Sequence, residues 1–241
     1  MSAKALSRTV FPIGNMLKAD VRKMVLSVHN GKLERINQRL SSAGLCFVGR
    51  RRSFANFMDN FLPPVPGNFI DVDTGKVAGT HYGKYHYAVG QRVRISGVEK
   101  PYYVVSKQME NDTDILVAAG AGHPALYTRK VTTQSPFWIG GNPFDTCNEV
   151  ECYFRFQHQH PLVKCKVRYN GTKTGLNIDL TERPMRAVSP GQYAVLYKNG
   201  TTTTNSQNLR CMGSARIINN RPSLLECGIF EHQPMHQTIF A

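Results

Sequence analysis

A single cysteine, Cys46, stands in the stretch "GLCFVGRRR" (44–52), with a glycine shortly before it and three consecutive arginines after it. The thiolate is the reactive form of cysteine, and neighbouring cationic side chains lower the thiol pKa and so favour that form. The alternative is a core residue, because free cysteines are among the residues most often buried. The arginine run favours the reactive interpretation. Cys46 is therefore the candidate nucleophile.

A second candidate lies in "ECYFRFQHQ" (151–159), which reads as a β-strand. Two-residue alternation divides its side chains between one face with Cys152, Phe154 and Phe156 and the other with Tyr153, Arg155 and Gln157. An exposed aromatic ring beside an arginine is suited to base stacking and phosphate contact. The solvated face of an ordinary barrel strand is an equally supported alternative.

Other motifs point to no cofactor. "GAGHPA" (120–125) is close to a dinucleotide-binding turn, but its proline lacks the backbone N–H and no helical pattern follows. "GTHYGK" (79–84) is one residue short of a phosphate-binding loop. His158 and His160 have no third ligand nearby, and the cysteine spacings fit no common zinc site. We therefore predict no nucleotide site and no metal site in this chain.

The charge balance favours an anionic partner. Lysine and arginine number 30 against 16 acids, a net charge of +14, and such an excess is typical of proteins that bind nucleic acid. Residues 1–60 hold eleven basic and three acidic side chains, and so carry +8 of that charge. A solvated basic face, or the general basicity of a mitochondrial protein, is the alternative. No run of 18 or more apolar residues occurs, so we predict no membrane partner.

Hydrophobic periodicity predicts mainly β structure after a short helical start. Residues 17–29 and 53–62 have helical spacing, and three prolines within 63–66 end the second helix. After residue 67 come short runs rich in valine, tyrosine and isoleucine. "YYVVSKQMENDTDILVAAG" (102–120) reads as a hairpin, and Asn-Gly pairs at 170–171 and 199–200 predict two more. Strands at this spacing predict a small barrel or sandwich. The six cysteines are read as reduced, because a chain of this size needs no disulfide framework.

Several motifs also occur in a familiar order. "SSAGLCFVGRRR" (41–52) follows D/E-S-x-G-x-C-F-I-G, "LPPVPG" (62–67) follows L-x-x-x-P-G, and "YAVGQR" (87–92) follows Y-x-x-G-Q-R. Further matches are "LSRTVFPIG", "PYYVV", "GHPALY", "ECYFRFQHQHPLVKC", "SPGQYAVLY" and "CMGSARI". On these residues the chain resembles the tRNA-specific 2-thiouridylases from Leu6 to about Ile218. "ECYFRF" is nearer to the mitochondrial branch than to the bacterial one, so a mitochondrial location is expected.

The resemblance implies a domain order. Residues 1–45 would be a remnant of an N-terminal α/β nucleotide-binding domain, 46–130 a central α+β domain and 131–220 a C-terminal β-barrel. Residues 221–241 lack periodicity, so we expect a loosely ordered tail there. The family's S-G-G-x-D-S pyrophosphate loop and its first catalytic cysteine do not occur in the sequence. Ser41 stands where the family usually has Asp or Glu. Because "LSRTVFPIG" matches mature family sequence, any targeting signal is expected upstream of it.

The resemblance also implies an activity, the exchange of oxygen for sulfur at C2 of the wobble uridine of tRNA. ATP with Mg would adenylate the 2-oxygen in the complete enzyme, and a persulfide on Cys46, loaded by a donor protein, would deliver the sulfur. The cysteine that resolves the persulfide by forming a disulfide would belong to the part not found here. RNA contacts would fall on Arg155, Phe156 and Gln192, although alternation places Phe156 inside. A non-catalytic tRNA-binding module is the alternative function.

Overall fold

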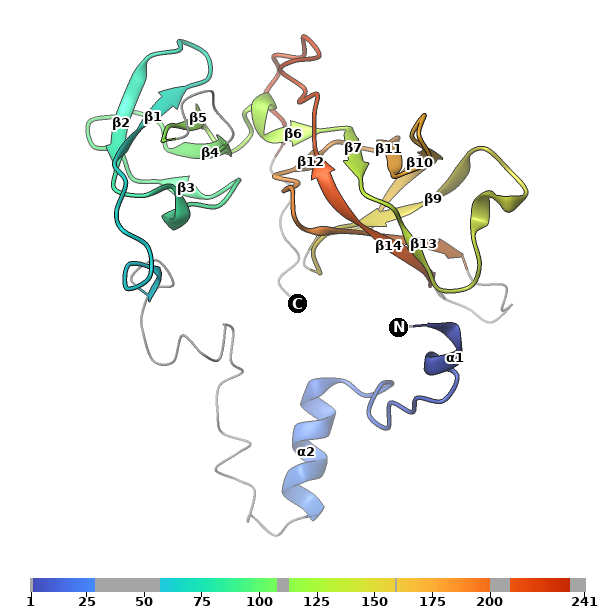
Figure 1. Cartoon of the computed structure of the whole chain (residues 1–241). Helices are drawn as coiled ribbons and strands as arrows, with labels where there is room; N and C mark the ends of the chain where they lie inside the picture. Colours follow the sequence, from blue (N-terminus) through green and yellow to red (C-terminus); the bar gives the residue numbers. More distant parts are fainter. Residues whose placement is uncertain (1, 29–56, 108–112, 159, 200–208, 235–241) are drawn as a thin grey trace. The chain divides into compact units, whose positions relative to one another are not determined.

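The structure is a computed structural model that describes residues 2–28, 57–107, 113–158, 160–199 and 209–234. The chain divides into two compact units, Met1–Phe57 and Met58–Ala241. Figure 1 shows the elements of both in chain order. Within the described residues, no helix is both long enough and apolar enough to cross a membrane.

The described part of the first unit contains two helices, α1 (Ala3–Leu6) and α2 (Lys18–Val28). The second of these confirms the helix expected over 17–29. Every residue from 2 to 27 is exposed or half-buried. Its exposed large apolar side chains are Leu6, Val10, Phe11, Ile13, Met16, Leu17, Met24 and Leu26. Residues 2–27 therefore form no core of their own.

The second unit begins with a five-stranded sheet. Its strands are β1 (Gly67–Asp71), β2 (Val77–His81), β3 (Arg92–Val93), β4 (Tyr102–Ser106) and β5 (Ile115–Ala119), with a 3-10 turn η2 (Lys84–His86) after β2. The strand order is β2-β1-β5-β4-β3, and only β1 and β5 pair in parallel. The antiparallel pairing of β4 with β5 confirms the hairpin expected over 102–120. The sheet closes on a small core of Phe69, Val93, Val104, Ile115 and Val117.

The larger sheet is a closed barrel. Its strands are β7 (Lys130–Thr133), β8 (Phe137–Trp138), β9 (Val150–Arg155), β10 (Val163–Tyr169), β11 (Leu176–Leu180), β13 (Tyr193–Asn199) and β14 (Leu209–Asn219). The order is β13-β9-β10-β11-β7-β14-β8, and β13 also pairs with β14. That extra pairing closes the ring of β13, β9, β10, β11, β7 and β14, and leaves β8 outside it on β14. The barrel confirms the mainly β class predicted from the sequence.

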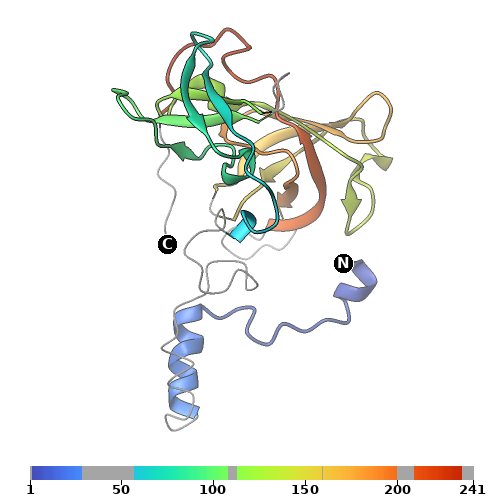
Figure 2. The same ribbon diagram turned by 60° about the vertical axis from the view of Figure 1, so that its left-hand side comes forward.

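Short elements complete this unit. A two-stranded ribbon joins β6 (Tyr127–Thr128) to β12 (Met185–Arg186), and the 3-10 turns are η3 (Pro124–Leu126) and η4 (Pro143–Asp145). The long strand β14 curves across the barrel in both ribbon views (Figures 1 and 2). Alternate residues along the strands point inward, because barrel strands present one face to the core. The inward residues form one large apolar cluster.

Both Asn-Gly pairs lie at the ends of strands that pair as hairpins. Strands β10 and β11 pair antiparallel, with Tyr169 opposite Leu176, so six residues make the connection rather than two. The side chain of Asn170 shapes this turn, because its Oδ1 accepts hydrogen bonds from the N–H groups of Thr174 (2.9 Å) and Gly175 (3.2 Å). The second hairpin joins β13 to β14, and residues 200–208 lie outside the described residues.

The C-terminal segment differs from the loosely attached tail expected over 221–241. Leu224 is only 3% exposed, and its N–H donates to the carbonyl of Tyr127 at 2.9 Å. Further along, the N–H of Gln233 donates to the carbonyl of Gly122 at 2.7 Å. Hydrophobic periodicity predicts only helices and strands. It therefore could not predict a segment that is held by one buried leucine and a few backbone hydrogen bonds. Residues 235–241 lie outside the described residues.

Arg186 on β12 connects the loops of the five-stranded sheet to the barrel side of the same unit. Its Nε donates to the carbonyl of Ala121 at 3.1 Å, and its Nη2 donates to the carbonyl of Gly90 at 3.1 Å. The guanidinium also lies 5.1 Å from the centre of the Tyr103 ring, within cation–π range. Gly90 has a φ of +81°, and a Cβ there would overlap that of Ala187. A side chain at position 90 would therefore open this junction.

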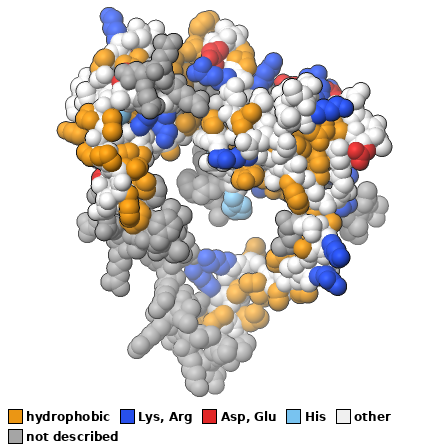
Figure 3. All heavy atoms as spheres, in the orientation of Figure 1, with side chains coloured by type: hydrophobic (Ala, Val, Ile, Leu, Met, Phe, Trp, Pro, Cys, Tyr) orange, Lys and Arg blue, Asp and Glu red, His pale blue; other side chains and the backbone are white. Residues whose placement is uncertain are grey.

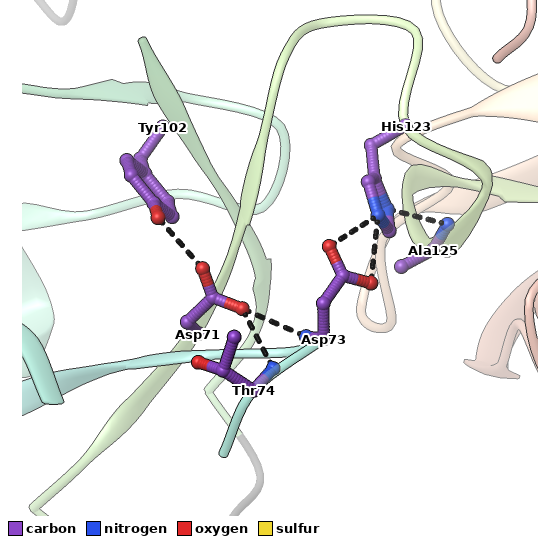
Figure 4. Close-up of polar contacts among 6 residues, drawn as sticks. All are labelled: Asp71, Asp73, Thr74, Tyr102, His123 and Ala125. Carbon is purple, nitrogen blue, oxygen red and sulfur yellow. Dashed lines mark hydrogen bonds and ion pairs between the residues drawn. The ribbon is translucent and has the colours of Figure 1, made fainter. Parts of the chain in front are cut away.

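A second polar connection reaches from the turn after β1 to η3 (Figure 4). The Asp73 carboxylate lies 3.1 Å from Nε2 of His123 through each of its oxygens. Nδ1 of His123 accepts a hydrogen bond from the N–H of Ala125 at 3.1 Å, and the ring proton therefore sits on Nε2, facing Asp73. His123 is buried, so this contact fixes the ring at the start of η3.

Asp71 organises the same turn. Its Oδ1 accepts from the N–H groups of Asp73 (2.8 Å) and Thr74 (3.0 Å), and its Oδ2 accepts from the Tyr102 hydroxyl at 2.6 Å. Burial raises the pKa of Asp71, but these hydrogen bonds outweigh burial and hold the pKa below its ordinary value of 3.8. The hydrogen bond to Asp71, together with burial, raises the pKa of Tyr102 to about 12.

We expect Tyr102→Phe to flatten the dependence of stability on pH. The raised pKa of Tyr102 contributes fully to the free energy of unfolding below its ordinary pKa of 10.0, and this contribution is lost as the pH rises through about 12. The lowered pKa of Asp71 contributes fully to the free energy of unfolding above its ordinary pKa of 3.8, and this contribution is lost as the pH falls through the lower folded pKa. The variant should lose only part of the alkaline dependence, because burial also raises the pKa values of Tyr87 and Tyr127. It should lose only part of the acid dependence, because two backbone donors remain on Asp71. Urea unfolding across both pH ranges measures this.

Tyr82→Phe is the matched control, because the Tyr82 side chain is 77% exposed. Its pH profile should follow that of the unmodified chain. Equal profiles for Tyr102→Phe and the unmodified chain would contradict the assigned hydrogen bond.

Candidate nucleic-acid interface

One end of the barrel collects the residues expected to contact RNA. Arg155 lies opposite Val195 in the pairing of β9 with β13. Two residues earlier on β13, Tyr193 lies opposite Arg216 of β14. Gln192 immediately precedes Tyr193. The register therefore brings Arg155, Gln192 and Arg216 to the same end of three neighbouring strands, which we call the Arg155 end.

Arg155 has a guanidinium nitrogen that makes no hydrogen bond within the described residues. The strand pleat directs it away from the core, because Phe154 and Phe156 on either side of it are buried. Its Nε is buried, and it has no hydrogen-bond partner among the described residues. An unpaired buried donor costs free energy, and a bound acceptor would recover that cost. A phosphate oxygen is such an acceptor.

Gln192 is positioned by its backbone. Its N–H donates to the carbonyl of Ser189 at 3.3 Å, and its own carbonyl accepts from the N–H of Ile217 at 2.7 Å. These bonds fix the start of β13 against β14. The Gln192 side chain is half-buried. An amide side chain at this position can both donate and accept hydrogen bonds.

Phe156 does not belong to this surface. Its side chain is 7% exposed and packs in the barrel core. It stacks on Phe154, with ring centres 6.1 Å apart, and its other neighbour is the His160 ring at 4.8 Å. Burial lowers the pKa of His160. The structure therefore corrects the RNA contact expected for Phe156 from the resemblance and agrees with the strand alternation, because a ring inside the core offers no face to a base.

Two further arginines at this end of the barrel were not predicted from the sequence. Arg216 is exposed on β14. Arg183 follows the end of β11, which lies beside the start of β10 and so at the same end of the barrel as Arg155. Its Nε is buried and has no hydrogen-bond partner in the part of the chain described. Within the same part, no ion pair joins Arg155, Arg183 or Arg216 to an acid. Alternation in "CMGSARI" marks Arg216 as outward. Its nearness to Arg155 depends on the strand register.

Farther from the Arg155 end, the outer face of β9, β10 and β11 neutralises its basic residues. Lys166 lies 3.3 Å from both Glu149 and Glu151, and Arg168 lies 3.4 Å from Glu149 and 3.0 Å from Asp179. Solvated ion pairs of this kind contribute little stability, but they remove positive charge from the surface of β9, β10 and β11. On the face shown in Figure 3, lysine and arginine side chains form several separate groups rather than one continuous patch. The arginines at the Arg155 end, which form no ion pair with an acid within the described ranges, are therefore better placed to bind an anion.

Cys46, the candidate nucleophile, lies outside the described residues, as do the three arginines after it. The five described cysteines are free thiols, exposed at Cys147 and Cys227, half-buried at Cys211 and buried at Cys152 and Cys165. In the described ranges no group of three His, Cys, Asp or Glu side chains is arranged to hold a metal ion.

Comparison with known proteins gives three consecutive family matches along the chain. They are the "tRNA methyl transferase HUP domain" over residues 1–50, the "tRNA methyl transferase PRC-barrel domain" over 55–119 and the "Aminomethyltransferase beta-barrel domain" over 128–217. The mitochondrial tRNA-specific 2-thiouridylase 1 of Drosophila melanogaster is 36% identical over 225 residues, which cover 92% of this chain and 54% of that protein. The chain belongs to the tRNA-specific 2-thiouridylase family.

Two further relatives of this family show the same extent of similarity. The human mitochondrial tRNA-specific 2-thiouridylase 1 is 36% identical over 92% of this chain and 50% of its own length. The tRNA-specific 2-thiouridylase MnmA 1 of Geobacillus kaustophilus is 36% identical over 90% of this chain and 54% of its own length. The chain thus spans about half the length of the curated relatives it matches.

Proposed function

We propose that this chain is the sulfur-transfer and tRNA-binding part of a mitochondrial tRNA 2-thiouridylase. Cys46 carries a persulfide, supplied by a donor protein, and the terminal sulfur attacks C2 of the wobble uridine. A second cysteine of the complete enzyme then forms a disulfide with Cys46, which breaks the persulfide S–S bond and leaves the sulfur on the uridine. ATP with Mg, used by the complete enzyme, adenylates the uridine 2-oxygen so that it departs as AMP. Family membership and the mitochondrial relatives support this assignment.

The Arg155 end of the barrel is the proposed tRNA contact. The observation that carries this proposal is the register of β9, β13 and β14, which places Arg155 and Arg216 at one end without an acidic partner in the described part. Arginine contacts to phosphate release counterions, so affinity falls as salt rises. Gln192 lies between the two arginines and is available for hydrogen bonds to sugar or base.

We expect Arg155→Ala to weaken tRNA binding several-fold and to flatten its salt dependence. Loss of one phosphate contact should reduce the slope of log affinity against log salt by about 0.7 to 0.9. Arg216→Ala should have the same kind of effect. Fluorescence anisotropy with labelled tRNA over a salt series measures affinity and slope together.

Arg168→Ala is the matched control, because this arginine is also on an outer barrel face but is paired with Glu149 and Asp179. Its slope should equal that of the unmodified chain. A smaller slope for Arg168→Ala than for Arg155→Ala would instead assign the tRNA contact to the outer face of β10 and β11, away from the Arg155 end. A tRNA affinity that did not change with salt concentration would contradict the proposed phosphate contacts altogether.

A non-catalytic tRNA-binding module is the second candidate function. It is favoured by the short match to the HUP domain, 50 residues, beside fuller matches to the two β domains. The two candidate functions can be distinguished by joining the chain to the N-terminal half of a relative. The enzyme part then thiolates tRNA in the presence of ATP and a sulfur donor, whereas a pure binding module only retains tRNA.

A further inference from the structure

Two buried cysteines face each other inside the barrel. Cys165 of β10 lies directly opposite Cys152 of β9 in the strand register. Their Sγ atoms are 3.5 Å apart, and the two side chains are 2% and 6% exposed. Both belong to the main core cluster of the barrel.

This arrangement is close to that of a disulfide. Directly opposed residues of antiparallel strands have Cβ atoms roughly 4.5–5.5 Å apart, and a disulfide needs about 3.5–4.5 Å. The sulfurs must approach by about 1.5 Å to reach bonding distance, which small side-chain rotations and strand shifts can provide. Core packing alone requires no such pairing, since any two small apolar residues would fill the space.

We propose that Cys152 and Cys165 are a redox pair that forms a cross-strand disulfide on reaction with a peroxide. One sulfur attacks hydrogen peroxide, so that an S–O bond forms, the O–O bond breaks and a sulfenic acid results. The second sulfur then attacks the first, forming the S–S bond as the S–O bond breaks. The two thiol protons leave with the oxygens. The products are one disulfide and two waters for each peroxide consumed.

Burial makes the reaction slow. The hydrogen bond with Cys152, followed by burial, raises the pKa of the Cys165 thiol, so little thiolate is present at neutral pH. Peroxide must also reach the sulfurs through local opening of the barrel. Oxidation should therefore be faster at alkaline pH, and slower than at the exposed Cys147 and Cys227.

The disulfide would join β9 to β10 next to the Arg155 end. Cys152 is three residues before Arg155 on the same strand. A cross-link between neighbouring strands limits the freedom of the unfolded chain and therefore resists unfolding. The oxidised barrel should be more stable than the reduced barrel.

The test uses a variant that retains only this pair, with Cys46→Ala, Cys147→Ala, Cys211→Ala and Cys227→Ala. After treatment with hydrogen peroxide, we expect the intact protein to lose the mass of two hydrogen atoms. A non-reducing digest should contain the Cys152 peptide joined to the Cys165 peptide. The melting temperature should rise by several degrees and return to its first value with reductant.

Cys165→Ala in the same background is the control. Peroxide should leave Cys152 there as a sulfenic acid, trapped by dimedone, without a rise in melting temperature. The unmodified chain, digested under non-reducing conditions, provides the same cross-link measurement if the fourfold variant does not fold. The proposal is wrong if both thiols of the pair still react with an alkylating reagent after peroxide treatment and denaturation. It is also wrong if the only products carry added oxygen.

Discussion

Cys46→Ser is expected to abolish tRNA thiolation when the chain is joined to the N-terminal half of a relative and supplied with ATP and a sulfur donor. The reason is chemical, because a serine hydroxyl cannot hold a transferable sulfane sulfur. The expectation follows from the arginine run beside the thiol and from the family motif around it. Mass spectrometry of digested tRNA measures 2-thiouridine directly, and tRNA binding should remain unchanged.

Cys147→Ser is the control for this experiment, because Cys147 is an exposed thiol outside the family motif. It should retain thiolation. Limiting alkylating reagent near neutral pH should modify Cys46 before the buried Cys152 and Cys165. Thiolation by the Cys46→Ser protein, or labelling of Cys46 after the buried pair, would show that Cys46 fills a core instead.

Phe156→Ala is expected to destabilise the barrel by about 3–5 kcal/mol without a specific effect on RNA contact. Its ring is 7% exposed and lies between Phe154 and His160, so truncation leaves a cavity in the core. Urea unfolding gives the loss of stability. Anisotropy at low temperature, where the variant remains folded, gives its tRNA affinity.

Two comparisons make this experiment decisive. Phe156→Leu retains most of the apolar volume and should cost much less stability, whereas Arg155→Ala should reduce tRNA affinity and leave the unfolding free energy nearly unchanged. A Phe156→Ala variant with full stability and weakened tRNA binding would show that Phe156 contacts RNA.

Short-range patterns in the sequence were sufficient to predict several local features of the structure. Alternation in "ECYFRF" assigned Phe154 and Phe156 to the inside and Arg155 to the outside, and the burial of β9 agrees. The helix over 17–29 and the hairpin of β4 with β5 followed from periodicity and turn residues. These features depend on residues close together in the chain, whose spacing is visible in the sequence.

Irregular structure was harder to predict from the sequence. The Asn170 turn acts through side-chain hydrogen bonds across six residues, so the Asn-Gly pair indicated the hairpin but not the length of its connection. The segment around Leu224 packs against Tyr127 without any periodic pattern. Arg186 could not be recognised as a junction residue, because its carbonyl partners on Gly90 and Ala121 lie far away in the chain.

The sequence by itself determined the mainly β class, the inward and outward faces of the strands and the family to which the chain belongs. The tertiary structure decided which outward residues are neighbours. Only the pairing of β13 with both β9 and β14 closes the barrel and brings Arg155, Gln192 and Arg216 to one end. Only the register of β9 and β10 sets Cys152 against Cys165. The physical reason is that a side-chain pattern specifies the face of a strand, whereas its partners depend on the hydrogen-bond register between strands distant in the chain.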